Sequence, residues 1–336
     1  MEGDNLSKEH KPKFLHDELP KELQEFLSTL PIEKGWPVPH YYQYQGVWYN
    51  PIILEATLTC QKHFQANDTD ILLVSIPKAG TTWLKSLAFA LLNRERYPNI
   101  QTHPLVTNNP HALVPFLELD LYSDQHFLPK LQALSSPRLL STHLPYISLP
   151  TSVKESTCKI IYVSRNPKDT FISYWHFANK MVQKTKEPIS LEEAFQLFCR
   201  GVSPYGPFCE HVLAYWKASL ERPEKVLFLS FEDMKMRPTF YLKELAKFIE
   251  CPFSEEEEAQ GMVDDILKLC SFDNMRNLEA NKVGKIPLGM ESNTYFRRGQ
   301  VGDWKNYLTV EMVEHLNTIT EKKLGEHGIK FSDFTE

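Results

Sequence analysis

The most constraining feature of this sequence is an apolar run that ends in a short loop rich in glycine and threonine and is followed at once by a helical pattern. Residues 70–76 (DILLVSI) are almost continuously apolar, as in a strand buried on both faces of a parallel sheet. After the loop, apolar residues recur at helical spacing from Trp83 to Leu92, with Arg94 and Arg96 in the last turn. The segment therefore predicts a strand, a tight loop and a helix.

Three further apolar segments are strand candidates, and helical patterns lie between or after them. They cover residues 138–142, 159–164 and 225–230, and a last helix is predicted over about 309–324. Strands that alternate with helices predict an α/β fold, with a central, mainly parallel sheet flanked by helices. At 336 residues the chain allows either one large domain or two smaller ones. Residues 1–20 are rich in charge without a sustained apolar period and predict a mobile N-terminal extension.

Charge and hydropathy exclude several kinds of partner. A formal net charge of −6 provides no broad basic field for nucleic acid or for an anionic membrane, so any anionic ligand must meet locally placed cations. The longest apolar run, residues 84–92, is too short to span a bilayer. Six scattered cysteines and the lack of a secretory signal predict reduced thiols and a cytoplasmic protein.

The loop at residues 77–83 (PKAGTTW) has the parts of a phosphate-binding loop. A helix that starts directly after a strand presents free amides and the positive end of its dipole to an anion. Gly80 permits close backbone approach, Thr81 and Thr82 add hydroxyl donors, and Lys78 adds a full charge. The nucleotide-triphosphatase pattern is absent, because Lys78 precedes Gly80. By itself the loop is also consistent with a simple turn that caps a helix.

Two other segments, taken together with this loop, indicate what kind of protein the chain is. Residues 158–169 (CKIIYVSRNPKD) deliver an arginine after a strand, and residues 295–305 (YFRRGQVGDWK) lie near the C-terminus. Together with the loop they closely resemble the cytosolic sulfotransferase family, from about Glu33 to Phe331. The wording at residues 198–201 and 278–282 is most similar to the plant branch. The resemblance implies one sulfotransferase domain over residues 21–336 and the sulfuryl donor 3′-phosphoadenylyl sulfate (PAPS). It also implies adenosine 3′,5′-bisphosphate (PAP) as product and no metal.

The resemblance also assigns donor-binding roles to individual positions. Lys78, Ala79, Gly80, Thr81, Thr82 and Trp83 match the loop that cradles the 5′-phosphosulfate, with the Trp83 ring against adenine. Arg165 and Ser173 match the pair that grips the 3′-phosphate, and Phe272 matches the second aromatic face around adenine. A closing loop that completes the 3′ grip corresponds to Arg297, Arg298 and Gly299.

The resemblance identifies His143, which follows the strand at 138–142, as the catalytic base. A histidine in such a place is more often a hydrogen-bonded structural residue, and only the family match reverses that expectation. The implied mechanism is in-line transfer, in which His143 deprotonates the acceptor hydroxyl and Lys78 stabilises charge on the departing phosphate. Ser173 is expected to help switch Lys78 between partners.

Four positions carry a residue that differs from the one most common in the family. Ala79 stands where serine is usual, and little effect is expected because the backbone donors stay. Phe231 stands where a tyrosine usually offers its hydroxyl to the nucleotide, so one hydrogen bond is expected to be missing. Arg298 replaces a usual lysine and keeps its charge. Ser141 occupies a position that is often lysine in animal members, so no acceptor contact is carried over to it.

The resemblance also leads to expectations about the acceptor molecule and about homodimer formation. Phe116, Trp175, His176, Tyr205 and Phe208 lie in segments that border the acceptor cavity in relatives, which indicates a flat, apolar, hydroxylated small molecule. Flavonoids, steroid-like hormones, hydroxyjasmonates and desulfoglucosinolates all stay open. A short dimer motif is matched by Lys305, Thr309, Val310 and Glu314 and predicts a weak homodimer, although the same residues also describe a helix N-terminus.

Two other functions compete with the sulfotransferase hypothesis. A nucleotide-dependent kinase would also use a phosphate loop between strand and helix, but it would require the missing spacing. A nucleotide- or ligand-binding protein that has lost catalysis is the second alternative, because Ala79 and Phe231 already depart from the pattern. Transfer of labelled sulfate distinguishes the three.

Overall fold

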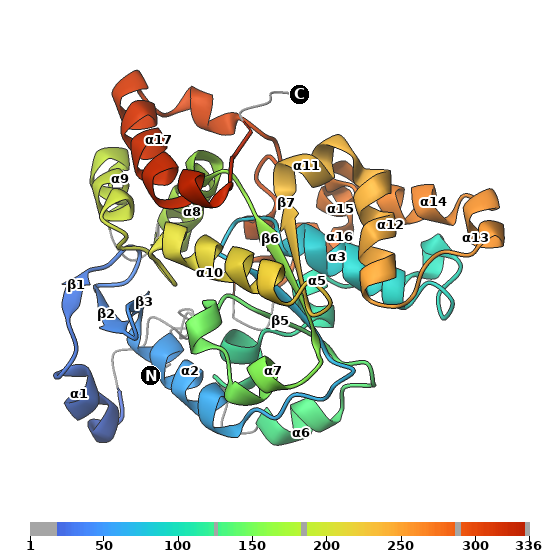
Figure 1. Cartoon of the computed structure of the whole chain (residues 1–336), viewed down its shortest axis with the longest axis horizontal. Helices are drawn as coiled ribbons and strands as arrows, with labels where there is room; N and C mark the ends of the chain where they lie inside the picture. Colours follow the sequence, from blue (N-terminus) through green and yellow to red (C-terminus); the bar gives the residue numbers. More distant parts are fainter. Residues whose placement is uncertain (1–18, 124–126, 183–186, 286–289, 333–336) are drawn as a thin grey trace, which may run out of the picture.

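The fold is described from a computed structural model over residues 19–123, 127–182, 187–285 and 290–332 (Figure 1). The mobile extension predicted over residues 1–20 lies almost wholly outside the described residues, so that prediction stays untested.

A four-stranded parallel sheet forms the centre of the molecule. Its order is β5 (Leu139–Thr142), β4 (Ile71–Ser75), β6 (Lys159–Ser164) and β7 (Val226–Ser230). Each of these strands was predicted to within one residue at either end, and the α/β fold with a parallel sheet is confirmed. Since the carboxyl ends of parallel strands meet at one edge, the segments that follow β4, β5 and β6 come together there.

Alternate residues of the strands enter two different cores. Leu72 and Val74 of β4 pack on one side with residues of α2 (Pro51–His63), α7 (Thr151–Glu155) and α10 (Phe208–Glu221). Ile71 and Leu73 pack on the other side with residues of α3 (Thr81–Leu92), α12 (Pro238–Phe248) and α14 (Met262–Leu269). Burial on both faces explains why β4 is a continuous apolar run instead of an alternating one.

A third core joins the N- and C-terminal parts of the chain. It contains residues of α8 (Pro167–Val182), α9 (Leu191–Cys199) and α17 (Val310–Leu324), together with Trp36. The Trp36 indole donates to the carbonyl of Val202 at 3.0 Å. Nearby lies a second, antiparallel sheet of β1 (Ile32–Lys34), β2 (His40–Tyr44) and β3 (Val47–Tyr49). This sheet was not predicted, because strands of three to five residues are too short to show a clear period.

The other helices are short connections around these layers. They are α1 (Lys21–Leu27), α4 (Pro104–Thr107), α5 (Pro110–Leu113), α6 (Phe127–Gln132), α11 (Phe231–Met236), α13 (Glu255–Ala259), α15 (Phe272–Asn277) and α16 (Glu279–Lys282). Single turns are η2 (Ile100–Thr102), η3 (Leu117–Leu121, a π-turn), η4 (Tyr146–Ser148), η5 (Ser292–Tyr295), η6 (Asp303–Asn306) and η7 (Gly325–His327).

One predicted helix end was wrong. Helix α3 stops at Leu92, so Arg94 and Arg96 lie beyond its last turn. Arg94 instead pairs with Glu257 at 2.6 Å and donates to the carbonyl of Leu91. A tertiary ion pair, which a helical pattern cannot show, therefore fixes this residue.

The structure also bears on the cysteines and on the apolar segments of the chain. All six cysteines are free. No helix among the described residues has the length and apolar character needed to cross a membrane.

Candidate active site

The loop between β4 and α3 has an unusual backbone. Gly80 occupies the N-cap position of α3 with φ of 115°, and a Cβ there would come within 2.8 Å of Cδ2 of Phe231. Because no side chain caps the helix, its first amides are available to an anion. Lys78 also has a positive φ, 71°, which is costly for a residue with a side chain. The loop thus holds a strained lysine beside an uncapped helix N-terminus.

Lys78 lies among cations and aromatic rings. Its Nζ lies 4.4 Å from the ring centre of Phe177 and 5.4 Å from that of Tyr295. Burial, together with the nearby positive charges of Arg297 and Arg165, lowers the pKa of Lys78 to about 7. A bound anion would reverse that effect, since an opposite charge favours the ammonium form.

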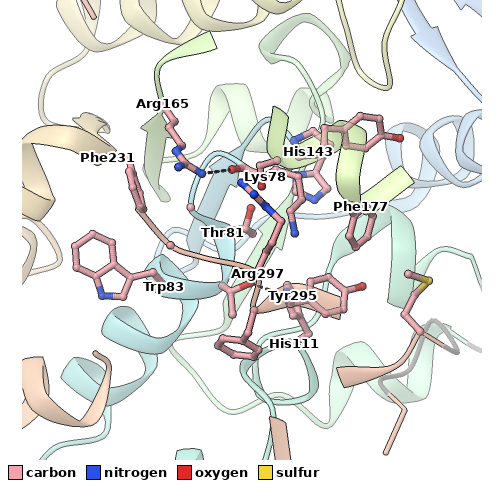
Figure 2. A pocket seen from close by; sticks show the side chains of 18 of the residues that line it. Lys78, Thr81, Trp83, His111, His143, Arg165, Phe177, Phe231, Tyr295 and Arg297 are labelled. Carbon is pink, nitrogen blue, oxygen red and sulfur yellow. Dashed lines mark hydrogen bonds between the residues drawn. The ribbon is translucent and has the colours of Figure 1, made fainter. Parts of the chain in front are cut away.

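Arg165 follows directly after β6 and is directed at the same loop (Figure 2). Its Nη2 donates to the carbonyl of Gln300 at 2.6 Å, and its Nη1 lies 3.4 Å from the carbonyl of Lys78. Its guanidinium also lies over the ring of Phe231, 4.6 Å from the ring centre. Arg165 therefore joins the phosphate loop to the C-terminal segment around residue 300.

The segment at 297–299 is held by one carboxylate and one ring. Asp303 forms ion pairs with Arg297 at 2.5 Å and with Arg298 at 2.6 Å. Burial opposes ionisation of Asp303, but these two arginines keep its pKa below the usual range. Gly299 lies so close to Phe272 that a Cβ would be 2.4 Å from the ring, which only glycine avoids.

His143 is fixed in one orientation by its surroundings. Its Nδ1 lies 2.6 Å from the carbonyl oxygen of Ser75, which only accepts, so Nδ1 carries the hydrogen. Nε2 is then left with its lone pair, and no described residue hydrogen bonds to it. Burial lowers the pKa of His143 to about 3, with smaller contributions from the charges of Lys85 and His211. The imidazole is therefore neutral at pH 7.

The buried carboxylate of Glu118 holds the backbone of His143. Its Oε1 accepts from the amide of His143 at 2.8 Å, and its Oε2 accepts from the hydroxyl of Thr142 at 2.7 Å. On the other side, His211 donates through Nε2 to the carbonyl of His143 at 3.0 Å. These contacts fix the end of β5 from both directions.

A cavity of about 380 Å³ collects most of the predicted site residues. It is lined by Lys78, Gly80, Thr81, Thr82, Trp83, Phe116, His143, Arg165, Ser173, Tyr205, Phe231, Phe272, Arg297, Arg298 and Gly299. Figure 2 shows how Thr81, Trp83, His143, Arg165, Phe231 and Arg297 lie around Lys78. The catalytic and donor-binding candidates other than Ala79 thus lie in one continuous hollow, although they come from six separate parts of the sequence.

Four predicted residues lie elsewhere. Ala79 is fully buried in the third core and does not line the cavity. Trp175 and Phe208 were expected at the acceptor cavity, but Trp175 donates to the carbonyl of Ile189, and Phe208 packs against Phe331. Their aromatic surfaces belong to the third core.

His176, the fourth, lines an adjoining hollow instead. It shares that hollow with Lys78, Ser173 and Arg297, beyond the wall formed by Phe177. Trp175, His176 and Phe177 are consecutive in α8, so their side chains point to different sides of the helix.

Several residues at the cavity were missed. Phe177, Tyr295 and His111 line it, and Glu118 supports it from behind. Glu118 lies in a π-turn, and His111 and Phe177 lie in helices without a motif, so no sequence signal pointed to them. Tyr295 is the first residue of the 295–305 segment but was given no role of its own. Within the described residues no group of histidine, cysteine or carboxylate side chains is arranged to hold a metal ion.

Comparison with known proteins identifies what this site resembles. Residues 68–328 match the family model described as the sulfotransferase domain. Cytosolic sulfotransferase 5 of Arabidopsis thaliana is 50% identical over 94% of this chain and 98% of its own length.

Solved structures give the same result. An Arabidopsis thaliana crystal structure assigned as a steroid sulphotransferase has 41% identity and a TM-score of 0.74, over 95% of this chain and 100% of its own. A mouse sulfotransferase complexed with PAP has 28% identity and a TM-score of 0.65, over 84% of this chain and 94% of its own.

Proposed function

The chain belongs to the sulfotransferase family, and on that premise we propose that it transfers the sulfuryl group of PAPS to a hydroxyl of a small, largely apolar acceptor. Sulfuryl transfer from PAPS gives PAP as the second product, and the mouse relative is complexed with PAP.

The observation that carries the proposal is the position of His143 relative to Lys78. Both line one cavity, with Nδ1 of His143 tied to Ser75 and Nε2 left as a hydrogen-bond acceptor. A neutral imidazole with a free lone pair is the form that accepts a hydroxyl proton. Lys78 supplies a cation within the same hollow.

The donor's charge fits the residues of the cavity. A nucleotide with phosphate groups at both its 3′ and 5′ ends needs cations at both ends. Lys78 and the amides of α3 suit the 5′ end, while Arg165, Ser173 and Arg297 suit the 3′ phosphate. Trp83 and Phe272 line the hollow between the two and offer flat faces to an adenine.

The proposed reaction is a direct displacement at sulfur. The acceptor oxygen forms a bond to sulfur while the bond from sulfur to the 5′-phosphate oxygen breaks. The acceptor's proton goes to Nε2 of His143, and Lys78 stabilises the negative charge on the departing oxygen. Ser173 lines both hollows with Lys78 and is suited to receive its ammonium before transfer.

The acceptor side of the cavity is apolar and aromatic. Phe116 lies 4.7 Å from His143 between ring centres, Tyr205 lies 5.4 Å from it, and Phe177 adds a further ring. Such walls favour a flat molecule that brings a hydroxyl to Nε2. Flavonoids, steroid-like hormones, hydroxyjasmonates and desulfoglucosinolates stay open as acceptor classes. We also propose a cytosolic location, supported by the names of the relatives.

The test is transfer of radiolabelled sulfate from PAPS to a panel of these four acceptor classes. Labelled acceptor in at least one class, lost in His143→Ala, is the expected result. Binding of PAP with no transfer to any acceptor would favour a protein that has lost catalysis. Consumption of ATP in place of PAPS would favour a kinase.

A further inference from the structure

A chain of three side chains leads from the interior of the protein to the phosphate loop. The Nζ of Lys85 lies 3.1 Å from Nδ1 of His111, and Nε2 of His111 lies 3.0 Å from Oγ1 of Thr82. Thr82 and His111 line the cavity, whereas Lys85 is completely buried behind them. Neither Lys85 nor His111 has a role in the function proposed above.

While Lys85 is in its ammonium form, the chemistry of these groups fixes the direction of every hydrogen bond in the chain. The Lys85 ammonium has only donors, and it also donates to the carbonyl of Val114 at 2.7 Å. It must therefore donate to Nδ1 of His111, which leaves the ring hydrogen on Nε2. Nε2 then donates to Oγ1 of Thr82, and the hydroxyl hydrogen of Thr82 is left to donate elsewhere.

The charge of Lys85 is supported in the interior. Its Nζ lies 3.4 Å from the ring centre of Phe116, on the ring face that attracts a cation. Burial lowers the pKa of Lys85 and the carboxylates of Asp120 and Glu118 raise it, with a net value of about 7. The neighbouring charge of Lys85, added to burial, holds the pKa of His111 well below its usual value. His111 is thus neutral and has a single ring hydrogen.

The backbone of His111 is held independently of this chain. Its amide donates to Oδ1 of Asn109 at 2.9 Å, and Asn109 donates to Asn281 at 2.8 Å. The imidazole also stacks on Phe116 and lies 4.3 Å from Tyr295 between ring centres. The ring therefore has a fixed place even without its polar partners, which makes substitutions of its polar atoms informative.

We propose that Lys85 and His111 are positioning residues that orient the hydroxyl of Thr82 as a donor toward the 5′-phosphate end of the nucleotide. This inference rests on the proposed function, because it takes PAPS as the ligand of the loop. A hydroxyl rotates freely and can point its hydrogen either way. With its oxygen already accepting from His111, the Thr82 hydroxyl is prepared to donate to an anion without reorganisation.

The test is a double-mutant cycle measured by calorimetric binding of PAP to the full chain. Thr82→Val removes the hydroxyl, and His111→Phe removes the polar atoms while keeping a flat ring. We expect each to weaken binding about 10- to 100-fold, the cost of one hydrogen bond to a charged group. In the double variant we expect no further loss beyond that of Thr82→Val. Losses that multiply would overturn the proposal, as would unchanged affinity in His111→Phe.

Two more variants protect the test against misfolding. His111→Gln carries an amide with one acceptor and one donor at its end and should restore most of the affinity. Lys85→Met should weaken PAP binding severalfold when Thr82 is present but not in the Thr82→Val background. A loss in Lys85→Met that persists without the Thr82 hydroxyl would show a structural effect only and overturn the proposal.

The two proposals fail in different ways. Wild-type protein that binds no PAP and transfers no sulfate would contradict the proposed function itself. Wild-type protein that binds PAP while His111 and Thr82 act independently would leave that function intact and overturn only the orienting role.

Discussion

His143 donates from Nδ1 to the main-chain carbonyl of Ser75 at 2.6 Å, and Ser75 is the last residue of the strand that leads into the phosphate loop. One hydrogen bond thus sets the free nitrogen of the proposed base relative to the loop that carries Lys78. The bond depends on β4 and β5 being neighbours in parallel register, with Val74 opposite Thr142.

Replacing His143 by alanine should abolish sulfuryl transfer and leave PAP affinity within about twofold of wild type. The base faces the acceptor and accepts its proton, whereas the nucleotide is held by other residues. Steady-state transfer assays and calorimetric PAP binding measure the two effects. Retained turnover would contradict the assigned role.

PAP affinity should fall as the pH rises above 7, because the free protein then loses the charge of Lys78. The pKa of Lys78 is lowered to about 7, so the ammonium form prevails below that pH and the neutral amine above it. Binding of a phosphate to the neutral amine must therefore take up a proton, and affinity should fall up to about tenfold per pH unit well above the pKa.

Calorimetry at pH 8 in buffers of different ionisation enthalpy measures that proton uptake. Lys78→Arg is the matched control, since arginine stays charged and should bind PAP without proton uptake. Equal proton uptake in the two proteins would exclude Lys78 as its source.

Arg165→Ala should raise the KM for PAPS by about 10- to 100-fold, as loss of a charged contact to a phosphate would. The same change removes the tie to Gln300 and the contact over Phe231. Arg165→Lys keeps the positive charge but loses the planar set of guanidinium donors, and we expect an intermediate KM. An unchanged KM in Arg165→Ala would rule out the clamp.

Phe231→Tyr should tighten PAP binding severalfold. The Phe231 ring lines the cavity next to Trp83, with ring centres 5.6 Å apart. A hydroxyl added to this ring would therefore be able to hydrogen bond to the bound nucleotide. One ordinary hydrogen bond is worth about 1 kcal/mol. Titration of both proteins with PAP measures the difference, and weaker binding by the tyrosine variant would show that the added hydroxyl is not accommodated.

Val310→Glu should shift a homodimer toward monomer without changing turnover per chain. Val310 is apolar but 69% exposed. It is the first residue of α17, and Thr309 caps that helix. A glutamate in the first turn suits the helix dipole, so the helix itself should persist. Sedimentation velocity over a concentration series measures the change. Identical sedimentation of wild type and variant would locate any dimer contact elsewhere.

The strands of the parallel sheet, the phosphate loop and the family could all be predicted from the amino-acid sequence alone. Burial on both faces makes β4 a continuous apolar run, and the loop, the 158–169 segment and the 295–305 segment are local patterns that can be read in order. Membership in the sulfotransferase family, first a resemblance carried by these three segments, was confirmed by comparison.

Which aromatic and titratable residues share the cavity depends on the packing of distant segments and could not be predicted from the sequence. Trp175 and Phe208 matched the acceptor-lining segments but pack into a core, whereas His111 and Glu118 carried no signal and are found beside the reacting groups. Helix rotation and irregular turns set the direction of a side chain, and the partners that fix it come from distant segments. The orientation of His143 is the clearest case, because it depends on a carbonyl 68 residues away.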